Sequence, residues 1–524
     1  MIASETLPQE FNVATYFVDR NVAEGRGGRP AFLYEDRVLT YADVQDLANR
    51  TGNVLRTLGV GLEDRVWMCC LDAPEFLGTF WGAIKMGAVP IPTNTLMRTA
   101  DYVYFLRDSR AKVAVVSAPL LAEAGPALGQ SPYLRHILVA GGPAGPYLSW
   151  EERVANASPT LEAAATSRDD AAFWLYSSGS TGFPKGAVHL HHDMVVCQET
   201  YARQVLGIRE TDRVYSAAKL FFAYGLGNAG YFPMGVGGQS ILYPHRPTPE
   251  SVFEILSRHR PTIFFGVPTL YAAMLAVKEA ERRYDLSALR LCVSAGEALP
   301  DELYARWRER FGVEVLDGIG TTEILHIFLS NRPGAARPGS TGQAVPGYEA
   351  ILVDDEGRPV PRGEIGNLRV KGDSTMPYYW NKHDKTKETL FGAWIQTGDK
   401  YHQDEDGYFW YAGRADDMLK VGGIWVSPIE VEATLIRHPA VLEAAVVGKE
   451  DTDRLVKPKA FVVLKEPAAG GATLAEELKS FVKDRIAPYK YPRWIDFVAE
   501  LPKTATGKIQ KFVLRGRRAA IAAQ

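Results

Sequence analysis

The chain has 524 residues, more than one hydrophobic core normally supports, so we expect at least two compact domains. Its net charge of -3 provides no basic surface for a polyanion, which argues against nucleic acid as a partner. No apolar segment of about 18 residues is present, and the N-terminal residues show no basic region before an apolar core. These features predict a cytoplasmic protein without a membrane partner.

The cysteines fit the same compartment. They occur at only four positions, mostly inside apolar runs and without a CxxC pair: Cys69, Cys70, Cys197 and Cys292. This usage is typical of reduced thiols in a core, and not of zinc ligands or a disulfide framework.

The first long element is a helix that follows Thr40. Apolar residues recur there at helical spacing, Thr40 and Asp43 form a capping-box pattern, and Gly59 is placed to end the helix. Short apolar runs then alternate with helix-like stretches; the runs are RVWMCCL, VPIP, KVAVVSA, HILVAG, TIFFGVP and LRLCVSAG. This alternation predicts an α/β fold of wound layers with much parallel sheet.

After about Asp354 the pattern changes to short strands with Asp-Gly and Gly-Gly turns, which predicts an antiparallel β unit. Beyond it come AVLEAAVVG, KAFVVLK, the amphipathic segment TLAEELKSFVKDRI and WIDFV. These segments predict a small α+β domain at the C-terminal end.

The segment YSSGSTGFPKG, residues 176–186, combines glycines, hydroxyls and one lysine. Glycine permits the positive φ angles with which backbone amides converge on phosphate oxygens. On composition alone, a flexible surface loop fits equally well. A Walker loop requires GxxxxGK(S/T), but Lys185 precedes Gly186, and a Rossmann loop requires a third glycine that Gly318-Ile319-Gly320 lacks.

The same loop resembles the acyl-adenylate-forming superfamily of acyl- and aryl-CoA synthetases, whose signature is (S/T)SG(S/T)TGxPKG. The resemblance implies the use of ATP, Mg²⁺ and coenzyme A. It also implies that the loop wraps the β- and γ-phosphates of ATP. The residues concerned are Ser177, Ser178, Gly179, Ser180, Thr181, Gly182 and Lys185.

Further motifs follow in the superfamily's order. SAGEALP resembles the adenine-side segment, and DGIGTTE resembles the YGxTE element with Ile319 in place of tyrosine. We expect that replacement to weaken stacking on adenine only. The resemblance implies that Thr322 donates to the α-phosphate and that Glu323 holds Mg²⁺, a cation that prefers oxygen ligands. The adenine-side residues it implies are Ala295, Gly296, Glu297, Asp317, Gly318 and Ile319.

The last motifs lie in the C-terminal third. By the resemblance, Asp399 and Arg414 bind the ribose from its two sides, and Lys508 bridges the substrate carboxylate and the α-phosphate during adenylation. Taken alone, Asp399 is also typical of a turn and Arg414 of a surface ion pair.

The superfamily's hinge matches Asp416. We therefore predict an N-terminal domain over residues 1–415 and a small mobile domain over residues 416–524. The resemblance implies that the small domain rotates after adenylation and brings Gly422 and Gly423 to the pantetheine tunnel; a Gly-Gly β-turn is compatible with that role.

The acid-binding residues point to an aromatic substrate. Phe222, Ala223 and Tyr224, with Gly320, His326 and Ile327, match pocket positions in benzoate-CoA ligases. No lysine or arginine occurs among them to pair a second carboxylate, and bulky rings obstruct a long acyl chain. Core packing is the alternative for Phe222 and Tyr224. Because Tyr224 and His326 carry polar atoms, hydroxybenzoate and aminobenzoate remain open as substrates.

We therefore predict an aryl-CoA ligase that makes the CoA thioester of benzoate, or of a close aromatic acid, and releases AMP and pyrophosphate. The alternatives are an adenylation enzyme that loads a separate carrier protein and a nucleotide-binding protein without turnover. A homodimer is compatible with the sequence. His189, His191 and His192 complete no recognisable zinc spacing, and the resemblance makes His191 structural.

Overall fold

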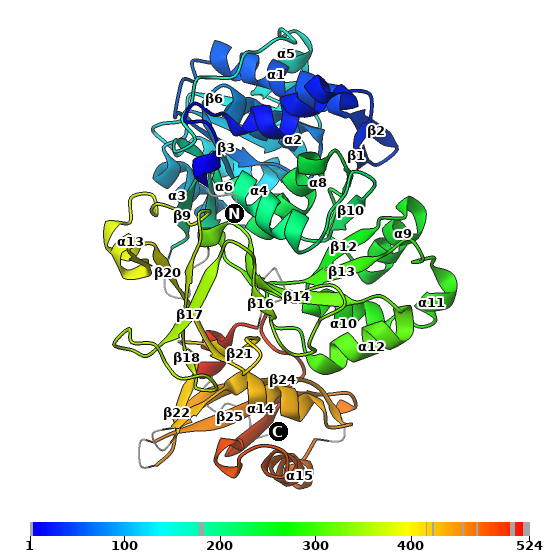
Figure 1. Cartoon of the computed structure of the whole chain (residues 1–524), viewed down its shortest axis with the longest axis vertical. Coiled ribbons are helices and arrows are strands. Elements are labelled where there is room, and N and C mark those ends of the chain that lie inside the picture. Colours follow the sequence, from blue (N-terminus) through cyan, green and yellow to red (C-terminus); the bar gives the residue numbers. More distant parts are fainter. Residues whose placement is uncertain are drawn as a thin grey trace. The chain divides into compact units, whose positions relative to one another are not determined.

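The computed structural model describes residues 4–177, 183–415, 417–421, 424–452, 455–467, 470–503 and 509–516 (Figure 1). Contacts within the chain define two compact units: Met1–Glu349 with Val370–Ile395, and Ala350–Arg369 with Gln396–Gln524. The expected domain boundary between residues 415 and 416 stays a prediction, because Asp416 lies outside the described residues. No described helix has the length and apolar character needed to cross a membrane.

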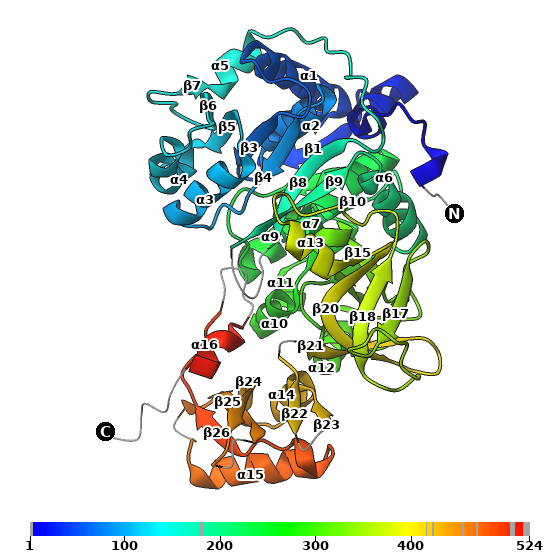
Figure 2. The ribbon, with the colours of Figure 1, turned by 90° about the vertical axis from the view of Figure 1, so that its left-hand side faces the viewer.

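The first sheet of the first unit is parallel, in the order β4-β3-β5-β6-β7. Its strands are β3 Arg65–Cys69, β4 Val89–Pro92, β5 Val113–Ser117, β6 His136–Ala140 and β7 Leu148–Ser149. The helices around it are α1 Tyr41–Thr57, α2 Pro74–Lys85, α3 Thr99–Ser109, α4 Leu121–Leu128 and α5 Trp150–Ala155. Figure 2 shows α1 and α2 on one side of this sheet and α3 and α4 on the other, the layered arrangement that the alternating apolar runs predict.

Helix α1 confirms the capping expected from the sequence. Thr40 accepts a hydrogen bond from the Asp43 backbone amide, the Asp43 side chain accepts from the Thr40 amide, and the helix ends just before Gly59. Gly59 has a φ of 77°, a left-handed conformation that glycine adopts without strain.

The larger sheet has nine strands in the order β16-β15-β14-β13-β12-β10-β11-β1-β2. They are β1 Pro30–Tyr34, β2 Arg37–Thr40, β10 Arg213–Ser216, β11 Gln239–Leu242, β12 Ile263–Gly266, β13 Leu291–Ser294, β14 Val315–Gly320, β15 Ile327–Ser330 and β16 Gln343–Ala344. The run from β1 to β14 is parallel, whereas β2, β15 and β16 pair antiparallel at the edges.

Helices pack on this sheet, and the core between the helices and the sheet is rich in aromatic residues. They are α6 Asp193–Cys197, α7 Ala223–Gly225, α8 Phe232–Val236, α9 Pro249–His259, α10 Pro268–Ala276, α11 Ala280–Arg283 and α12 Asp301–Phe311. Figure 1 shows α9 to α12 beside β12, β13 and β14, where Phe253, Tyr271 and Trp307 are buried against Phe264. A separate hairpin is formed by β8 Ala171–Ser177 and β9 Lys185–Leu190.

A third sheet follows, with the order β17-β18-β20-β19 and β21 paired to β20. Its elements are β17 Glu349–Val353, β18 Gly366–Lys371, α13 His383–Thr389, β19 Leu390–Phe391, β20 Trp394–Gln403 and β21 Phe409–Arg414. It corresponds to the antiparallel β unit expected after Asp354, since β20 pairs antiparallel with both β19 and β21.

The C-terminal elements form the small α+β layer expected from the sequence. They are β22 Leu419–Val421, β23 Ile424–Val426, α14 Pro428–Ile436, β24 Val441–Glu450, β25 Val456–Leu464, α15 Ala472–Lys483, β26 Trp494–Phe497 and α16 Lys511–Gly516. One face of the β24-β25-β26 sheet packs on α14 and α15 through Leu435 and Leu478, and the other packs on Leu514 of α16. Each face thus has its own apolar cover.

Candidate active site

The phosphate-loop sequence lies at the turn of the β8–β9 hairpin. Strand β8 ends at Ser177, β9 begins at Lys185, and these two residues are cross-strand partners. The strand pairing therefore fixes both ends of the loop. The loop's centre lies outside the described residues, so the role expected there stays a prediction for Ser178, Gly179, Ser180, Thr181 and Gly182.

The Glu323 carboxylate lies beside this hairpin. Glu323 belongs to the short 3-10 helix η7 Thr322–Ile324, which follows β14. Its Oε1 accepts hydrogen bonds from Ser177 Oγ at 2.8 Å and from the Tyr379 hydroxyl at 2.6 Å. No described residue donates a hydrogen bond to its Oε2. A carboxylate with one oxygen anchored and the other open fits the ligand chemistry of Mg²⁺.

Lys185 and Thr322 complete this polar cluster. Lys185 Nζ lies 3.4 Å from the Tyr379 hydroxyl and 4.5 Å from the centre of its ring. The Thr322 carbonyl accepts a hydrogen bond from His189 Nε2 at 2.7 Å, whereas its hydroxyl bonds to none of the described residues. An ammonium group and an open hydroxyl beside a glycine-rich turn suit a phosphate ligand.

The three histidines after the loop are engaged with protein groups. His189 Nδ1 lies 2.7 Å from the buried Asp193 carboxylate, and His192 contacts two backbone carbonyls. His191 Nδ1 accepts a hydrogen bond from the Val13 amide at 3.1 Å, and burial lowers the pKa of His191 to about 3. Within the described ranges, no three or more His, Cys, Asp or Glu side chains form a group that could hold a metal ion.

The expected adenine-side residues lie where β13 and β14 end. Gly296 adopts a φ of 91° in the turn after β13, between Glu297 and the buried Ala295. Asp317 begins the DGIG run within β14; burial raises the pKa of its carboxyl well above the usual range. Asp317 Oδ1 finds no hydrogen-bond donor among the described residues. An open polar atom here is compatible with nucleotide binding.

Gly318, Ile319 and Gly320 follow Asp317 in β14, where they face the antiparallel strand β15. A Cβ at Gly320 would lie 2.5 Å from the His326 carbonyl oxygen, so only glycine fits this approach. The strand thus connects the expected adenine side to the expected acid pocket.

The expected acid-pocket residues lie at α7 and at the start of β15. Ala223 and Tyr224 open α7, Phe222 precedes it with its ring 4.6 Å from that of Phe221, and the buried Ile327 begins β15. The ring of His326 lies 5.7 Å from that of Tyr224. Tyr224 and His326 are thus neighbours in space, and the acid pocket expected from the sequence stays a prediction.

The protons of this cluster are directed to protein acceptors, whereas His326 Nδ1 finds no partner among the described residues. The Tyr224 hydroxyl donates to the Gly266 carbonyl at 3.3 Å. His326 Nε2 lies 3.3 Å from the Tyr224 carbonyl and 3.2 Å from Asn228 Oδ1, and burial lowers the pKa of His326 to about 3. The imidazole is therefore neutral at physiological pH, and Nε2 carries its proton because the Tyr224 carbonyl can only accept.

In the second unit the structure brings Asp399 and Arg414 together. They are cross-strand partners in β20 and β21, and Arg414 Nη1 lies 3.1 Å from Asp399 Oδ1. Their ribose contacts stay predictions. So do the roles expected of Asp416, Gly422, Gly423 and Lys508, which lie outside the described residues.

The sequence motifs did not reveal three residues that shape these clusters. Tyr379 reaches Glu323 across a long chain separation, and Asn228 contacts His326. A Cβ at Gly227 would lie 2.3 Å from His326 Cδ2. The only sequence signal for Tyr379 is the aromatic run PYYW, which does not say what it contacts.

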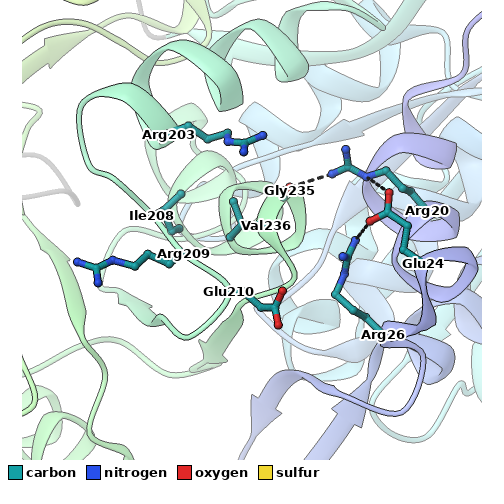
Figure 3. A pocket seen from close by; sticks show the side chains of 9 residues that line it. All are labelled: Arg20, Glu24, Arg26, Arg203, Ile208, Arg209, Glu210, Gly235 and Val236. Carbon is teal, nitrogen blue, oxygen red and sulfur yellow. Dashed lines mark hydrogen bonds and ion pairs between the residues drawn. The ribbon is translucent and has the colours of Figure 1, made fainter.

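A separate surface pocket of about 320 Å³ is rich in arginine (Figure 3). Arg20 donates to the Gly235 carbonyl at 2.8 Å, and Arg26 pairs with Glu24. Arg203, also in its wall, pairs with Glu199. None of the expected site residues lines this pocket.

Comparisons with known proteins agree with the motifs. The family described as AMP-binding enzyme matches residues 19–380, and the AMP-binding enzyme C-terminal domain matches residues 430–508. A benzoate-CoA ligase of Thauera aromatica is 54% identical over 511 residues, covering 97% of this chain and 96% of the relative.

Two solved structures have a similar fold. An anthranilate CoA ligase in complex with anthranoyl-AMP gives a TM-score of 0.93 at 47% identity, covering 98% of both chains. A benzoate CoA ligase from Burkholderia xenovorans gives a TM-score of 0.89 at 50% identity, covering 96% of this chain and 100% of the other. The chain therefore belongs to the AMP-binding enzyme family, the superfamily of AMP-forming acyl- and aryl-CoA synthetases.

Proposed function

We propose that the protein is an ATP- and Mg²⁺-dependent aryl-CoA ligase that converts benzoate, or a close aromatic carboxylate, to its CoA thioester through an acyl-adenylate. One observation carries this proposal: beside the β8–β9 hairpin, a Glu323 oxygen and the Thr322 hydroxyl have no hydrogen-bond partner among the described residues, and the same unit contains the Tyr224–His326 ring pair. The identity of 54% to a benzoate-CoA ligase supports the substrate class.

In the first step the substrate carboxylate attacks the α-phosphate of ATP, so the protein must align the reactants and offset charge. Lys185 and the hairpin turn bind the β- and γ-phosphates, and the Thr322 hydroxyl donates to the α-phosphate. Glu323 is the protein ligand of Mg²⁺, which supplies positive charge to the phosphate oxygens when bound. Lys508 bridges the substrate carboxylate and the α-phosphate, and Asp399 and Arg414 bind the ribose.

In the second step the CoA thiol displaces AMP. We propose that rotation about Asp416 removes Lys508 and brings in Gly422 and Gly423, where the lack of a side chain leaves room for the pantetheine arm. In the first step Phe222 shields the adenylate from water.

The hydrogen bonds of the acid cluster leave one acceptor for a ring substituent. The protons of Tyr224 and His326 are directed to protein acceptors, whereas His326 Nδ1 has no partner among the described residues. A ring hydroxyl or amino group that reaches Nδ1 can donate to it, and one that does not is left without a partner at a cost of about 1 to 3 kcal/mol. Hydroxybenzoate and aminobenzoate therefore stay alternatives to benzoate.

The decisive experiment incubates the protein with ATP, Mg²⁺ and a panel of aromatic and aliphatic acids, with and without CoA, and follows AMP and thioester. AMP and thioester that both require benzoate and CoA support the ligase. Adenylate formation without thioester points to a separate carrier protein, and nucleotide binding without turnover for any acid points to a binding protein.

We also propose a cytoplasmic location and a possible homodimer. The four buried free thiols support a reducing compartment. Light scattering of the purified protein distinguishes a monomer from a homodimer.

A further inference from the structure

The segment around Tyr379 runs alongside β9 and extends the phosphate-loop hairpin. Tyr379 forms an antiparallel bridge with Ala187. The Val188 amide donates to the Tyr378 carbonyl at 3.2 Å, and the Trp380 amide donates to the Gly186 carbonyl at 2.8 Å. The backbone of Tyr379 is therefore fixed to the strand that begins with Lys185.

Side chains on both sides hold this segment in place. Trp380 Nε1 donates to the Asp108 carbonyl at 2.9 Å, and its ring lies 4.5 Å from that of Trp174. The Tyr379 amide donates to Thr386 Oγ1 at 3.0 Å. Because Tyr379 itself is only 3% exposed, its ring has little freedom to turn away.

The phenol links two residues of the proposed nucleotide site. Its single proton is donated to Glu323 Oε1, and its oxygen can accept a hydrogen bond from Lys185 Nζ. With Ser177 also on Oε1, Glu323 is held through one oxygen.

We propose that Tyr379 is a positioning residue, which anchors Glu323 Oε1 and leaves Oε2 to Mg²⁺. This inference rests on the proposed role of Glu323 as the magnesium ligand. Tyr379 itself touches neither metal nor nucleotide. It sets the orientation of the carboxylate before the metal arrives, and losing it costs affinity for the metal complex of ATP specifically.

The test is Tyr379→Phe, which removes the hydroxyl and keeps the ring. Calorimetric titration with ATP in excess Mg²⁺ is expected to show about tenfold weaker binding, as for loss of a hydrogen bond to a charged group. In EDTA, without free Mg²⁺, the dissociation constant of ATP is expected to change less than about twofold. The half-saturating Mg²⁺ concentration for adenylation is expected to rise about tenfold, with kcat at saturating Mg²⁺ nearly unchanged.

The chain offers a matched control. The Tyr16 hydroxyl donates to Glu199 Oε1 at 2.7 Å, the same pair of groups at nearly the same distance, away from the hairpin. Tyr16→Phe is expected to leave both ATP titrations and the Mg²⁺ dependence unchanged. A loss of metal-dependent binding in Tyr16→Phe as large as in Tyr379→Phe would overturn the proposal.

A second variant separates positioning from general damage. If Tyr379 acts through Glu323, the double variant Tyr379→Phe with Glu323→Gln binds Mg²⁺ and ATP no more weakly than Glu323→Gln alone. Additive losses, or equal losses with and without Mg²⁺, would contradict the inference. A wild-type protein that adenylates no acid yet shows Tyr379-dependent binding of Mg²⁺ and ATP would refute the proposed function and leave this inference standing.

Discussion

The Glu323 cluster and the His326 cluster, both in the first unit, use their polar groups in opposite ways. At Glu323, one carboxylate oxygen and the Thr322 hydroxyl make no hydrogen bond to any described residue. At His326, the ring proton and the Tyr224 hydroxyl are already directed to protein acceptors. The first cluster leaves an oxygen of Glu323 and the Thr322 hydroxyl without a described partner, whereas in the second the protons are taken up and the acceptor His326 Nδ1 is the polar atom without a described partner.

The largest effect is expected at Glu323, whose Oε2 has no described hydrogen-bond partner. Glu323→Gln keeps the shape but removes the negative charge on Oε2, so adenylation is expected to fall by about 1000-fold, comparable to losing a strong electrostatic contact in a transition state. Pyrophosphate release measured with benzoate checks this. Benzoate binding, followed by fluorescence quenching, is expected to stay within about twofold; a parallel loss would show that the two clusters are not separable.

The neutral histidines predict how stability depends on pH. The pKa values of His191 and His326 are lowered to about 3 in the folded chain, while the unfolded chain binds protons below about pH 6.5. Stability is therefore lost as the pH falls from about 6.5 towards 3, by about 2 kcal/mol for each histidine at pH 5. Melting temperatures measured between pH 7.5 and 5 report this loss of stability. In His191→Asn the melting temperature is expected to fall less over the same pH range than in the wild type. An equal fall would argue against a neutral His191.

An added methyl group at Gly227 tests whether His326 shapes the acid pocket. In Gly227→Ala the new methyl group would lie 2.3 Å from His326 Cδ2 and displace the buried ring. We expect KM for benzoate to rise about tenfold, while KM for ATP changes little, since the Glu323 cluster is untouched. The control is Gly471→Ala, because a Cβ at that position meets no atom within 4 Å. Gly312→Ala does not serve as a control, because Gly312 has a φ of 71°, a conformation that strains other residues.

The smallest effect is expected from Tyr224→Phe. The Tyr224 hydroxyl donates a hydrogen bond to the Gly266 carbonyl, so its removal is expected to lower the free energy of unfolding by about 1 kcal/mol. The kcat/KM for benzoate is expected to change less than about threefold. Chemical denaturation and steady-state kinetics give the two numbers. A larger loss of kcat/KM would mean that the hydroxyl binds the acid, and the contrast between the clusters would fail.

The fold was largely predictable because its signals are local. All six short apolar runs named from the sequence contain strands, from Arg65–Cys69 to Leu291–Ser294, and the Thr40 capping box is present. The amphipathic helix near the C-terminal end also forms, with Leu478 and Val482 buried. Alternation, capping and turn chemistry act over a few residues, so no long-range information is needed.

The site residues could be predicted only where they belong to a recognisable sequence motif. The motifs named Thr322, Glu323 and His326 as chain positions, but not what each side chain contacts. The Tyr379–Glu323 hydrogen bond and the need for glycine at position 227 depend on tertiary distances. The pairing of Asp399 with Arg414 likewise follows from the register of two strands, which the sequence pattern leaves open.

The buried cysteines have a practical consequence for testing the proposed domain rotation. All four belong to the first unit, and burial raises the pKa of Cys69, Cys197 and Cys292 to about 12. A maleimide dye reacts with exposed thiolate, so the native chain should remain almost unlabelled at neutral pH. Cysteines introduced at the exposed positions Tyr133 and Leu442, one in each unit, would then carry a fluorophore pair without removal of any natural cysteine. A change in energy transfer on addition of CoA to the adenylate-bound protein would support the proposed rotation, and a constant signal would contradict it.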